Sequence, residues 1–224
     1  MKVADYIKIF TQALNKVNNV YYGNKDWVDS MLNGNNVFEK DPRREKLIPL
    51  LSKHHERVFC YELYHQARKI METKQLTNQV FLQAELRKNQ VTSEIEELFE
   101  IKNINGPYYP DFLIHNPLSF DDQYLIIEVK ANPELNINDM VRDIKKIDEF
   151  INKYNYQKGI FLAINLSEKR LKALLNNNEF LKEINDSISY KDKILLIFKE
   201  DANKNQKLIN LNTLIENKGV SDDF

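Results

Sequence analysis

The sequence predicts an α/β fold in which a mixed central β-sheet of about four or five strands is flanked by helices. Two observations lead to this prediction. In the second half of the chain, apolar runs typical of buried strands alternate with helical patterns, as they do in βαβ units. Before them, two short apolar runs are separated by a polar, proline-containing segment, the pattern of a hairpin. A further helical region is expected at the N-terminal end.

Length and composition narrow the class of protein. The 224 residues are enough for one domain with a substantial core, and the formal net charge of −1 gives no overall attraction to nucleic acid. One cysteine, Cys60, excludes an internal disulfide framework and suits a reducing compartment. The first residues lack the apolar segment of a signal peptide, and no run approaches transmembrane length. We therefore expect a soluble, cytoplasmic protein without a membrane partner.

Periodicity predicts the elements before the hairpin. Apolar residues from Val3 to Val17 recur at helical spacing, and a long helical stretch follows a loop that contains Pro42. We expect this second helix to break near Pro49 or at His54-His55. The elements expected here are helices at about 2–20, 44–73 and 92–100, the last capped by Ser93, and a strand at 80–86.

The hairpin and the elements after it form the rest of the expected core. Its strands are Asp111–Ile114 and Tyr124–Val129, joined by the loop His115–Gln123. The later elements are a helix at about 137–154 entered by Asn136 or Asn138, a strand at 159–165, a helix at about 168–185 capped by Ser167, a strand at 193–199, and a small element in LINLNTLI. We expect an N-terminal helical extension at 1–55, a core at 56–200, and a polar tail or small added element at 201–224.

The hairpin gathers charged side chains. Pairing of its strands brings the start of the first, Asp111, close to the end of the second, Glu128. Because side chains alternate along a strand, Glu128 and Lys130 project from one face, away from Ile127 and Val129. Two carboxylates and one ammonium group then lie at one end of a largely buried sheet. Buried charges are costly unless they are paired or bind metal, so the sequence predicts a functional site here.

Pro110-Asp111 followed by Glu128-Val129-Lys130 resembles the PD-(D/E)XK signature of the restriction-endonuclease-like nuclease superfamily. The order helix, strand, strand, strand, helix, strand over about 56–165 is similar to the core of that superfamily. The resemblance implies that Asp111 and Glu128 bind Mg²⁺ or Mn²⁺, often with the Val129 carbonyl. It also implies that Lys130 positions or activates the attacking water. Hard oxygen ligands of this kind suit both ions.

Each residue also has a simpler interpretation. Asp111 could be a turn or strand-start residue, since aspartate is common there. Glu128 could pair with Lys130 along the strand face, and Lys130 could be a strand-end lysine that reaches water.

The resemblance further implies an acidic residue from the first core helix. Glu62 is our candidate, because it lies at the border between the polar and apolar faces of that helix. Glu85 is the rival, on a strand face shared with Gln83, which could hold a water or a phosphate oxygen. His65 lies one turn from Glu62, but a lone helical histidine is more often a packing or surface residue.

Substrate contacts are expected from basic and aromatic side chains near the site. Arg142, Lys145 and Lys146 fall on or near one face of the helix that follows Lys130, where they could contact phosphates. A second basic cluster comprises Arg43, Arg44 and Lys46. Solvated charged helix faces explain both clusters equally well. Tyr108 and Tyr109 could stack on bases, although aromatics at strand edges more often belong to the core.

These observations favour a metal-dependent nuclease that hydrolyses phosphodiester bonds, in DNA rather than RNA. The resemblance is compatible with a homodimer or with a separate specificity partner. The first alternative is a catalytically inactive module of the same fold that binds nucleic acid or a protein. The second is a structural protein in which the motif is accidental; a structure with Asp111 and Glu128 pointing to different sides of the sheet would establish it.

Overall fold

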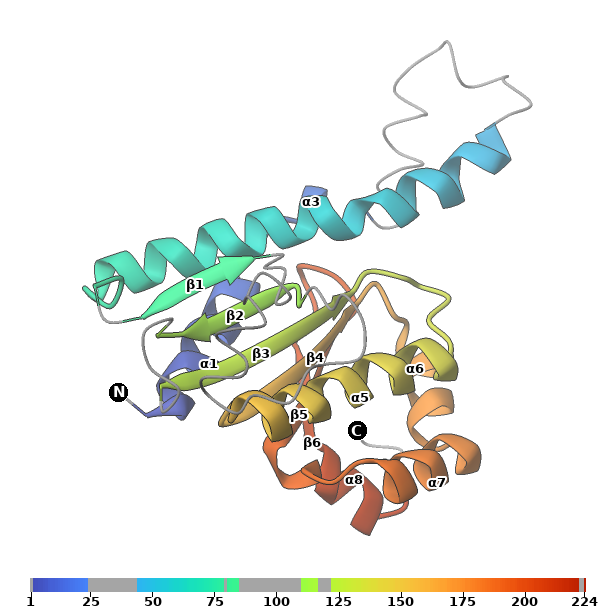
Figure 1. Cartoon of the computed structure of the whole chain (residues 1–224). Coiled ribbons are helices and arrows are strands. Elements are labelled where there is room, and N and C mark those ends of the chain that lie inside the picture. Colours follow the sequence, from blue (N-terminus) through green and yellow to red (C-terminus); the bar gives the residue numbers. More distant parts are fainter. Residues whose placement is uncertain (1, 24–43, 79, 85–109, 117–121, 222–223) are drawn as a thin grey trace, which may run out of the picture.

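The fold is α/β, with a six-stranded mixed sheet between two layers of helices (Figure 1). It is seen in a computed structural model. The described residues are 2–23, 44–78, 80–84, 110–116, 122–221 and 224, except for the side chains of 44–54. Within them, no helix is long and apolar enough to cross a membrane.

The sheet has the strand order β1-β2-β3-β4-β5-β6. The central strands β3, β4 and β5 are parallel to one another, and the other neighbouring pairs are antiparallel. The strands are β1 (Phe81–Ala84), β2 (Phe112–His115), β3 (Gln123–Lys130), β4 (Lys158–Ile164), β5 (Ile194–Lys199) and β6 (Lys207–Asn210). The first five match the expected strands, and β6 makes the sheet larger than the expected four or five strands.

Helices cover both faces of the sheet (Figure 1). On one face, α1 (Val3–Leu14) and α3 (Arg44–Thr73) pack over Phe112, Ile127 and Val129. On the other, α5 packs over Leu113 and Ile126. The helices of this second layer are α5 (Ile137–Tyr154), α6 (Glu168–Leu175), α7 (Asn178–Ser187) and α8 (Leu211–Glu216). The expected alternation of the hairpin strands is confirmed in β3. Leu125, Ile127 and Val129 pack on the side of α1 and α3, whereas Ile126 packs on the side of α5.

The N-terminal helices differ in detail from the prediction. Helix α1 ends at Leu14 rather than near residue 20, and a short 3-10 turn, η1 (Asn19–Tyr21), follows it. The break expected near Pro49 or His54-His55 is wrong, because α3 is one continuous helix. This helix also crosses the boundary expected between the regions 1–55 and 56–200. The helix expected at 92–100 lies outside the described residues.

Helix α5 is the element that completes the site, and its bounds agree with the prediction. The Asn136 side chain accepts a hydrogen bond from the Asp139 amide and so caps the first turn. The helix lies directly on β4, because Gly159 has no Cβ and one built there would overlap Ile147. Glycine at this position therefore helps to fix the distance between α5 and the sheet.

The C-terminal part also differs from the prediction. The helix expected at about 168–185 is two helices, α6 and α7. The two helices are separated at Asn177, which caps the N-terminus of α7: its side chain accepts a hydrogen bond from the Phe180 amide. Ser167 caps α6 as predicted. Beyond β5, the segment LINLNTLI forms most of β6 and α8, and Leu211 and Leu214 join the core beside α5.

Candidate active site at the end of the central hairpin

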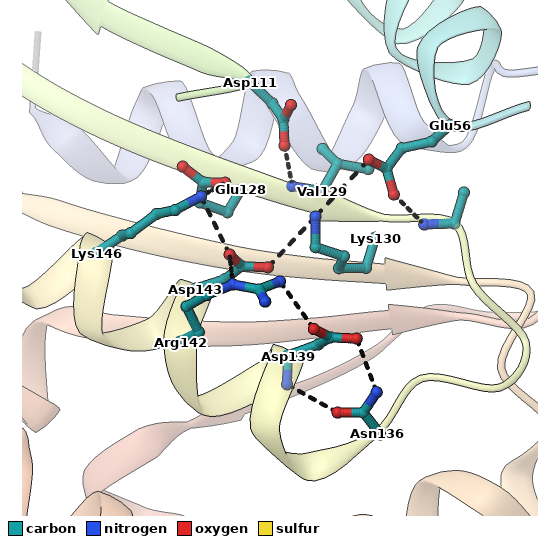
Figure 2. A network of polar contacts seen from close by, with 11 residues as sticks. Glu56, Asp111, Glu128, Val129, Lys130, Asn136, Asp139, Arg142, Asp143 and Lys146 are labelled. Carbon is teal, nitrogen blue, oxygen red and sulfur yellow. Dashed lines mark hydrogen bonds and ion pairs between the residues drawn. The ribbon is translucent and has the colours of Figure 1, made fainter. Parts of the chain in front are cut away.

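Asp111 and Glu128 lie together at the end of the hairpin, where Asp111 turns to the Val129 amide and Glu128 to Lys146 (Figure 2). Phe112 pairs with Ile127, so the register continued by one residue places Asp111 opposite Glu128. Leu113 and Ile126, the neighbours of the same parity, both pack toward α5. Carboxylates on different sides of the sheet would have established the accidental-motif alternative, and the structure does not place them so.

Asp111 closes the end of the hairpin. Asp111 directly precedes β2, and its Oδ2 accepts a hydrogen bond of 2.6 Å from the Val129 amide of β3. Burial raises the pKa of this carboxyl to about 6, against the opposing effects of the Val129 hydrogen bond and of Lys130. Asp111 therefore has a structural role at the strand end. Among the described residues, the hydrogen bond at this strand end uses Oδ2.

Glu128 is the most deeply buried member of the site. Its residue is 2% exposed, and its Oε2 lies 3.3 Å from Lys146 Nζ. Within the described part of the chain, its Oε1 is buried without a hydrogen-bond partner. The pKa of Glu128 is raised to about 8. Burial is the largest cause, and the negative charge of the neighbouring Asp111 is the second. The pair therefore resists double ionisation unless a cation joins it.

Lys130 lies between two other carboxylates (Figure 2). Its Nζ is 3.3 Å from Asp143 Oδ2 and 3.7 Å from Glu56 Oε1, and its side chain is 19% exposed. Burial alone would lower the pKa of Lys130. The carboxylates around it, Asp143 first, outweigh that effect and raise the pKa above its ordinary value. Lys130 is therefore a fixed positive charge beside the Asp111–Glu128 pair.

Glu56 is a site residue that sequence reasoning missed. It comes from α3, and its Oε2 accepts a hydrogen bond of 3.0 Å from the Ala131 amide, just after β3. Its other oxygen faces Lys130. A signal was present in the sequence: Glu56 falls on the helical stripe of Phe59 and Leu63, so a carboxylate interrupts an otherwise apolar face.

The other predicted helpers lie elsewhere. The Glu62 carboxylate accepts a hydrogen bond of 2.6 Å from Gln66, and six helical residues place it about 9 Å along the axis from Glu56. Gln83 reaches the buried His115 ring, 2.6 Å from its Nε2, at the opposite end of β2 from Asp111. His65 is exposed on α3. Catalytic and substrate-binding roles for Glu62 and Gln83 stay predictions.

One of the three predicted cations of α5 reaches the site. Lys146 pairs with Glu128, and its Nζ is also 3.1 Å from Asp143 Oδ1. Burial opposes the charge of Lys146, but Glu128 and Asp143 raise its pKa. Arg142 pairs at 2.9 Å with Asp139, near the start of the helix, and Lys145 turns to Glu183 of α7 at 2.5 Å.

Several other predicted site residues lie outside the described part of the chain. They are Glu85, Arg43, Tyr108 and Tyr109, and the side chains of Arg44 and Lys46.

The site has an excess of negative charge. Four carboxylates, those of Glu56, Asp111, Glu128 and Asp143, surround the ammonium groups of Lys130 and Lys146 (Figure 2). Arg142 also approaches, at 3.7 Å from Asp143, but its side chain is 61% exposed. The described residues contain no group of three or more His, Cys, Asp or Glu arranged to hold a metal ion.

Comparison of the chain with family models, with curated proteins and with solved structures finds no match. The chemistry of the site therefore has to be inferred from its own geometry.

The raised pKa values of the two carboxyls predict an unusual dependence of stability on pH. Between the ordinary pKa of Glu128, 4.5, and its value of about 8, the folded protein holds a proton that the unfolded chain has lost. The free energy of unfolding should therefore fall as pH rises from about 5 to about 8, by several kcal/mol in the absence of metal. Asp111 contributes in the same direction, up to about pH 6. Denaturant unfolding at a series of pH values measures this.

Glu128→Gln provides the comparison for that series, because glutamine has no carboxyl group to hold the proton between pH 5 and pH 8. Its unfolding free energy should vary less between pH 5 and pH 8 than that of the unmodified chain. Parallel curves for the two proteins would show that Glu128 does not hold a proton in the folded state.

Proposed function

We propose that this chain is a divalent-metal-dependent nuclease with a restriction-endonuclease-like core of the PD-(D/E)XK kind, hydrolysing phosphodiester bonds in DNA. One observation carries the proposal: Asp111 and Glu128 lie together on one buried face, with Lys130 two residues along the same strand. The α/β sheet with its parallel centre is compatible with that core. The buried Cys60 is compatible with a reducing, cytoplasmic setting.

The residues present fit a divalent cation. When all four carboxylates are ionised they exceed the two lysines by two negative charges, and Mg²⁺ or Mn²⁺ would balance that charge in place of the protons that burial favours on Asp111 and Glu128. Glu128 Oε1 is buried without a hydrogen-bond partner among the described residues. Two carboxylates together with a backbone carbonyl are hard oxygen donors, and Mg²⁺ commonly uses one or two carboxylates plus water and substrate phosphate. Asp111 and Glu128 would hold the ion, with the Val129 carbonyl as the third donor.

A bound divalent ion would supply Lewis-acid chemistry, lowering the pKa of a water and neutralising charge on the scissile phosphate. In the hydrolysis, the water oxygen forms a bond to phosphorus and the bond from phosphorus to the leaving sugar oxygen breaks. The attacking water gives up one proton to solvent, and the leaving oxygen takes one up from solvent. Lys130 would orient the water or stabilise the charge that develops on the phosphoryl oxygens.

Lys146 would contact the substrate phosphate from the α5 side. Its ammonium group lies against Glu128, and its side chain is 20% exposed, so it borders solvent at the site. Arg142 and Lys145 are more exposed, at 61% and 44%, and with Lys146 they line a cleft of about 620 Å³ between α5 and α7 that Glu149, Glu179 and Glu183 also line. These cations would contact the DNA backbone farther from the scissile bond.

An inactive module that binds nucleic acid or a protein partner is the second candidate. One observation favours it: Lys146 already neutralises Glu128 without any metal. If that ion pair persisted in solution, it would compete with a divalent ion for the Glu128 carboxylate.

Nicking of supercoiled plasmid DNA in Mg²⁺ or Mn²⁺ tests the function. The unmodified chain should nick the plasmid, chelation of the metal should stop the reaction, and Asp111→Ala should be inactive. Lys153→Ala is the matched control, because Lys153 lies on α5 but pairs with Glu149 at 2.5 Å. Equal nicking by the unmodified chain and Asp111→Ala would point to a contaminating nuclease. No nicking by either, together with DNA binding, would support the inactive module.

A further inference from the structure

Asp143 is a buried carboxylate on the face of α5 that packs against the sheet. It is 0% exposed, and its helical neighbours Met140, Ile144 and Ile147 all belong to the apolar core. A carboxylate in such a place is costly unless charged or hydrogen-bonded groups compensate it. The proposed chemistry of Asp111 and Glu128 gives Asp143 no task.

Cations surround this carboxylate. Asp143 Oδ1 lies 3.1 Å from Lys146 Nζ and 3.7 Å from Arg142 Nε, and its Oδ2 lies 3.3 Å from Lys130 Nζ. In the part of the chain that the structure describes, the partners of this carboxylate are these cations, and it uses one oxygen for each lysine.

Each lysine is in turn placed between Asp143 and a second carboxylate (Figure 2). Lys130 lies between Asp143 and Glu56, at 3.3 and 3.7 Å. Lys146 lies between Asp143 and Glu128, at 3.1 and 3.3 Å. Asp143 is the member that both lysines share. It thereby connects the last residue of β3 to the helix that covers it.

We propose that Asp143 is a positioning residue that holds the ammonium groups of Lys130 and Lys146 in place beside the Asp111–Glu128 pair. This inference rests on the proposed nuclease function for its catalytic consequence. Without the Asp143 charge, Lys130 keeps only the longer contact with Glu56 in this network, and Lys146 keeps only Glu128. Both side chains then gain freedom to leave the positions at which they would meet the phosphate.

Asp143→Asn tests the proposal, because asparagine keeps the shape of the side chain and removes its charge. Asp148→Asn is the matched control. Asp148 is also a buried carboxylate of α5, but its oxygens accept hydrogen bonds from the backbone amides of Ser189 and Tyr190. Both variants remove a buried carboxylate from the same helix, and only Asp143→Asn acts on the two lysines.

The first readout does not need activity. Lysine amines of the metal-free protein are acylated at one fixed pH, and the rate at each lysine is followed by mass spectrometry. In Asp143→Asn, Lys130 and Lys146 should react about tenfold faster, the effect of losing one coupled ion pair. Lys153 should be unchanged; its side chain is equally exposed at 19%, but it pairs with Glu149. Asp148→Asn should leave all three rates unchanged.

The second readout is steady-state cleavage of DNA. Asp143→Asn should lower kcat by roughly 10- to 100-fold, because the positioned charges act on the transition state. Asp148→Asn should lose thermal stability while its kcat at a temperature where it is folded stays close to that of the unmodified chain. If Asp143→Asn does not fold, Asp143→Ser, which leaves space for a water, takes its place.

The two readouts separate the two claims. Unchanged acylation of Lys130 and Lys146 in the folded Asp143 variant would overturn the positioning role. Faster acylation in a protein whose unmodified form cleaves no DNA would support the positioning role and overturn the proposed nuclease function.

Discussion

Glu128→Gln should reduce metal-dependent DNA cleavage by on the order of 10³-fold, since it removes a ligand that contributes several kcal/mol of charge stabilisation in the transition state. Glutamine has nearly the same shape and leaves the β3 pairing intact. It also removes a carboxyl whose pKa burial raises to about 8, so the metal-free fold at pH 8 should be as stable as before or more stable. Loss of activity without loss of stability would distinguish a metal ligand from a structural residue.

Initial rates over a range of Mg²⁺ concentrations measure this effect, with thermal unfolding recorded beside them. Glu72→Gln is the control, because Glu72 forms an exposed ion pair with Arg68 on α3, far along the helix from Glu56. That variant should cleave at the unmodified rate. Retained cleavage in Glu128→Gln would refute the assignment of Glu128 as a metal ligand.

Lys130→Met should lower kcat by roughly 10²- to 10³-fold, the size expected when a charged group aimed at the developing phosphoryl charge is removed. Methionine fills a similar volume along the strand without the ammonium group. The Mg²⁺ concentration at half-maximal rate should change little, because Lys130 is not among the proposed ligands. Lys130→Arg should recover only part of the rate, because a planar guanidinium cannot meet Asp143 and Glu56 as a compact ammonium does.

Lys130→Met should also cost stability, by about 2 kcal/mol, because it deprives the buried Asp143 of one of its cations. Rates are therefore compared at a temperature at which the variant is fully folded. A variant with an unchanged kcat would mean that Lys130 serves only to neutralise Asp143.

Much of the fold follows from local sequence. Helix α5 was predicted with its bounds and with Asn136 as one of two candidate caps, because its apolar period is strong and the capping side chain is next to it in the chain. The hairpin register follows from the alternation of β3, so the placement of Asp111 opposite Glu128 could be expected. The edge strand β6 could not, since its four residues are partly exposed and carry little periodicity.

The parts of the site that were missed depend on tertiary structure. Glu56 reaches Ala131 from 75 residues away, and no local pattern encodes that contact. Asp143 lies in sequence between the basic residues Arg142 and Lys146, and its position on the stripe of Met140 and Ile147 is the feature that marks it as facing the core. A carboxylate on an apolar helical stripe is therefore the signal that would have identified both residues.

Asp111 and Glu128 are proposed to hold a divalent cation together. Crystals soaked in Mn²⁺ and measured for anomalous scattering test it most directly. We expect one anomalous-difference peak between the two carboxylates, within coordination distance of the Val129 carbonyl, and Lys146 displaced from Glu128. The same crystals with no peak at that position, and with Lys146 still paired to Glu128 at saturating Mn²⁺, would contradict the account.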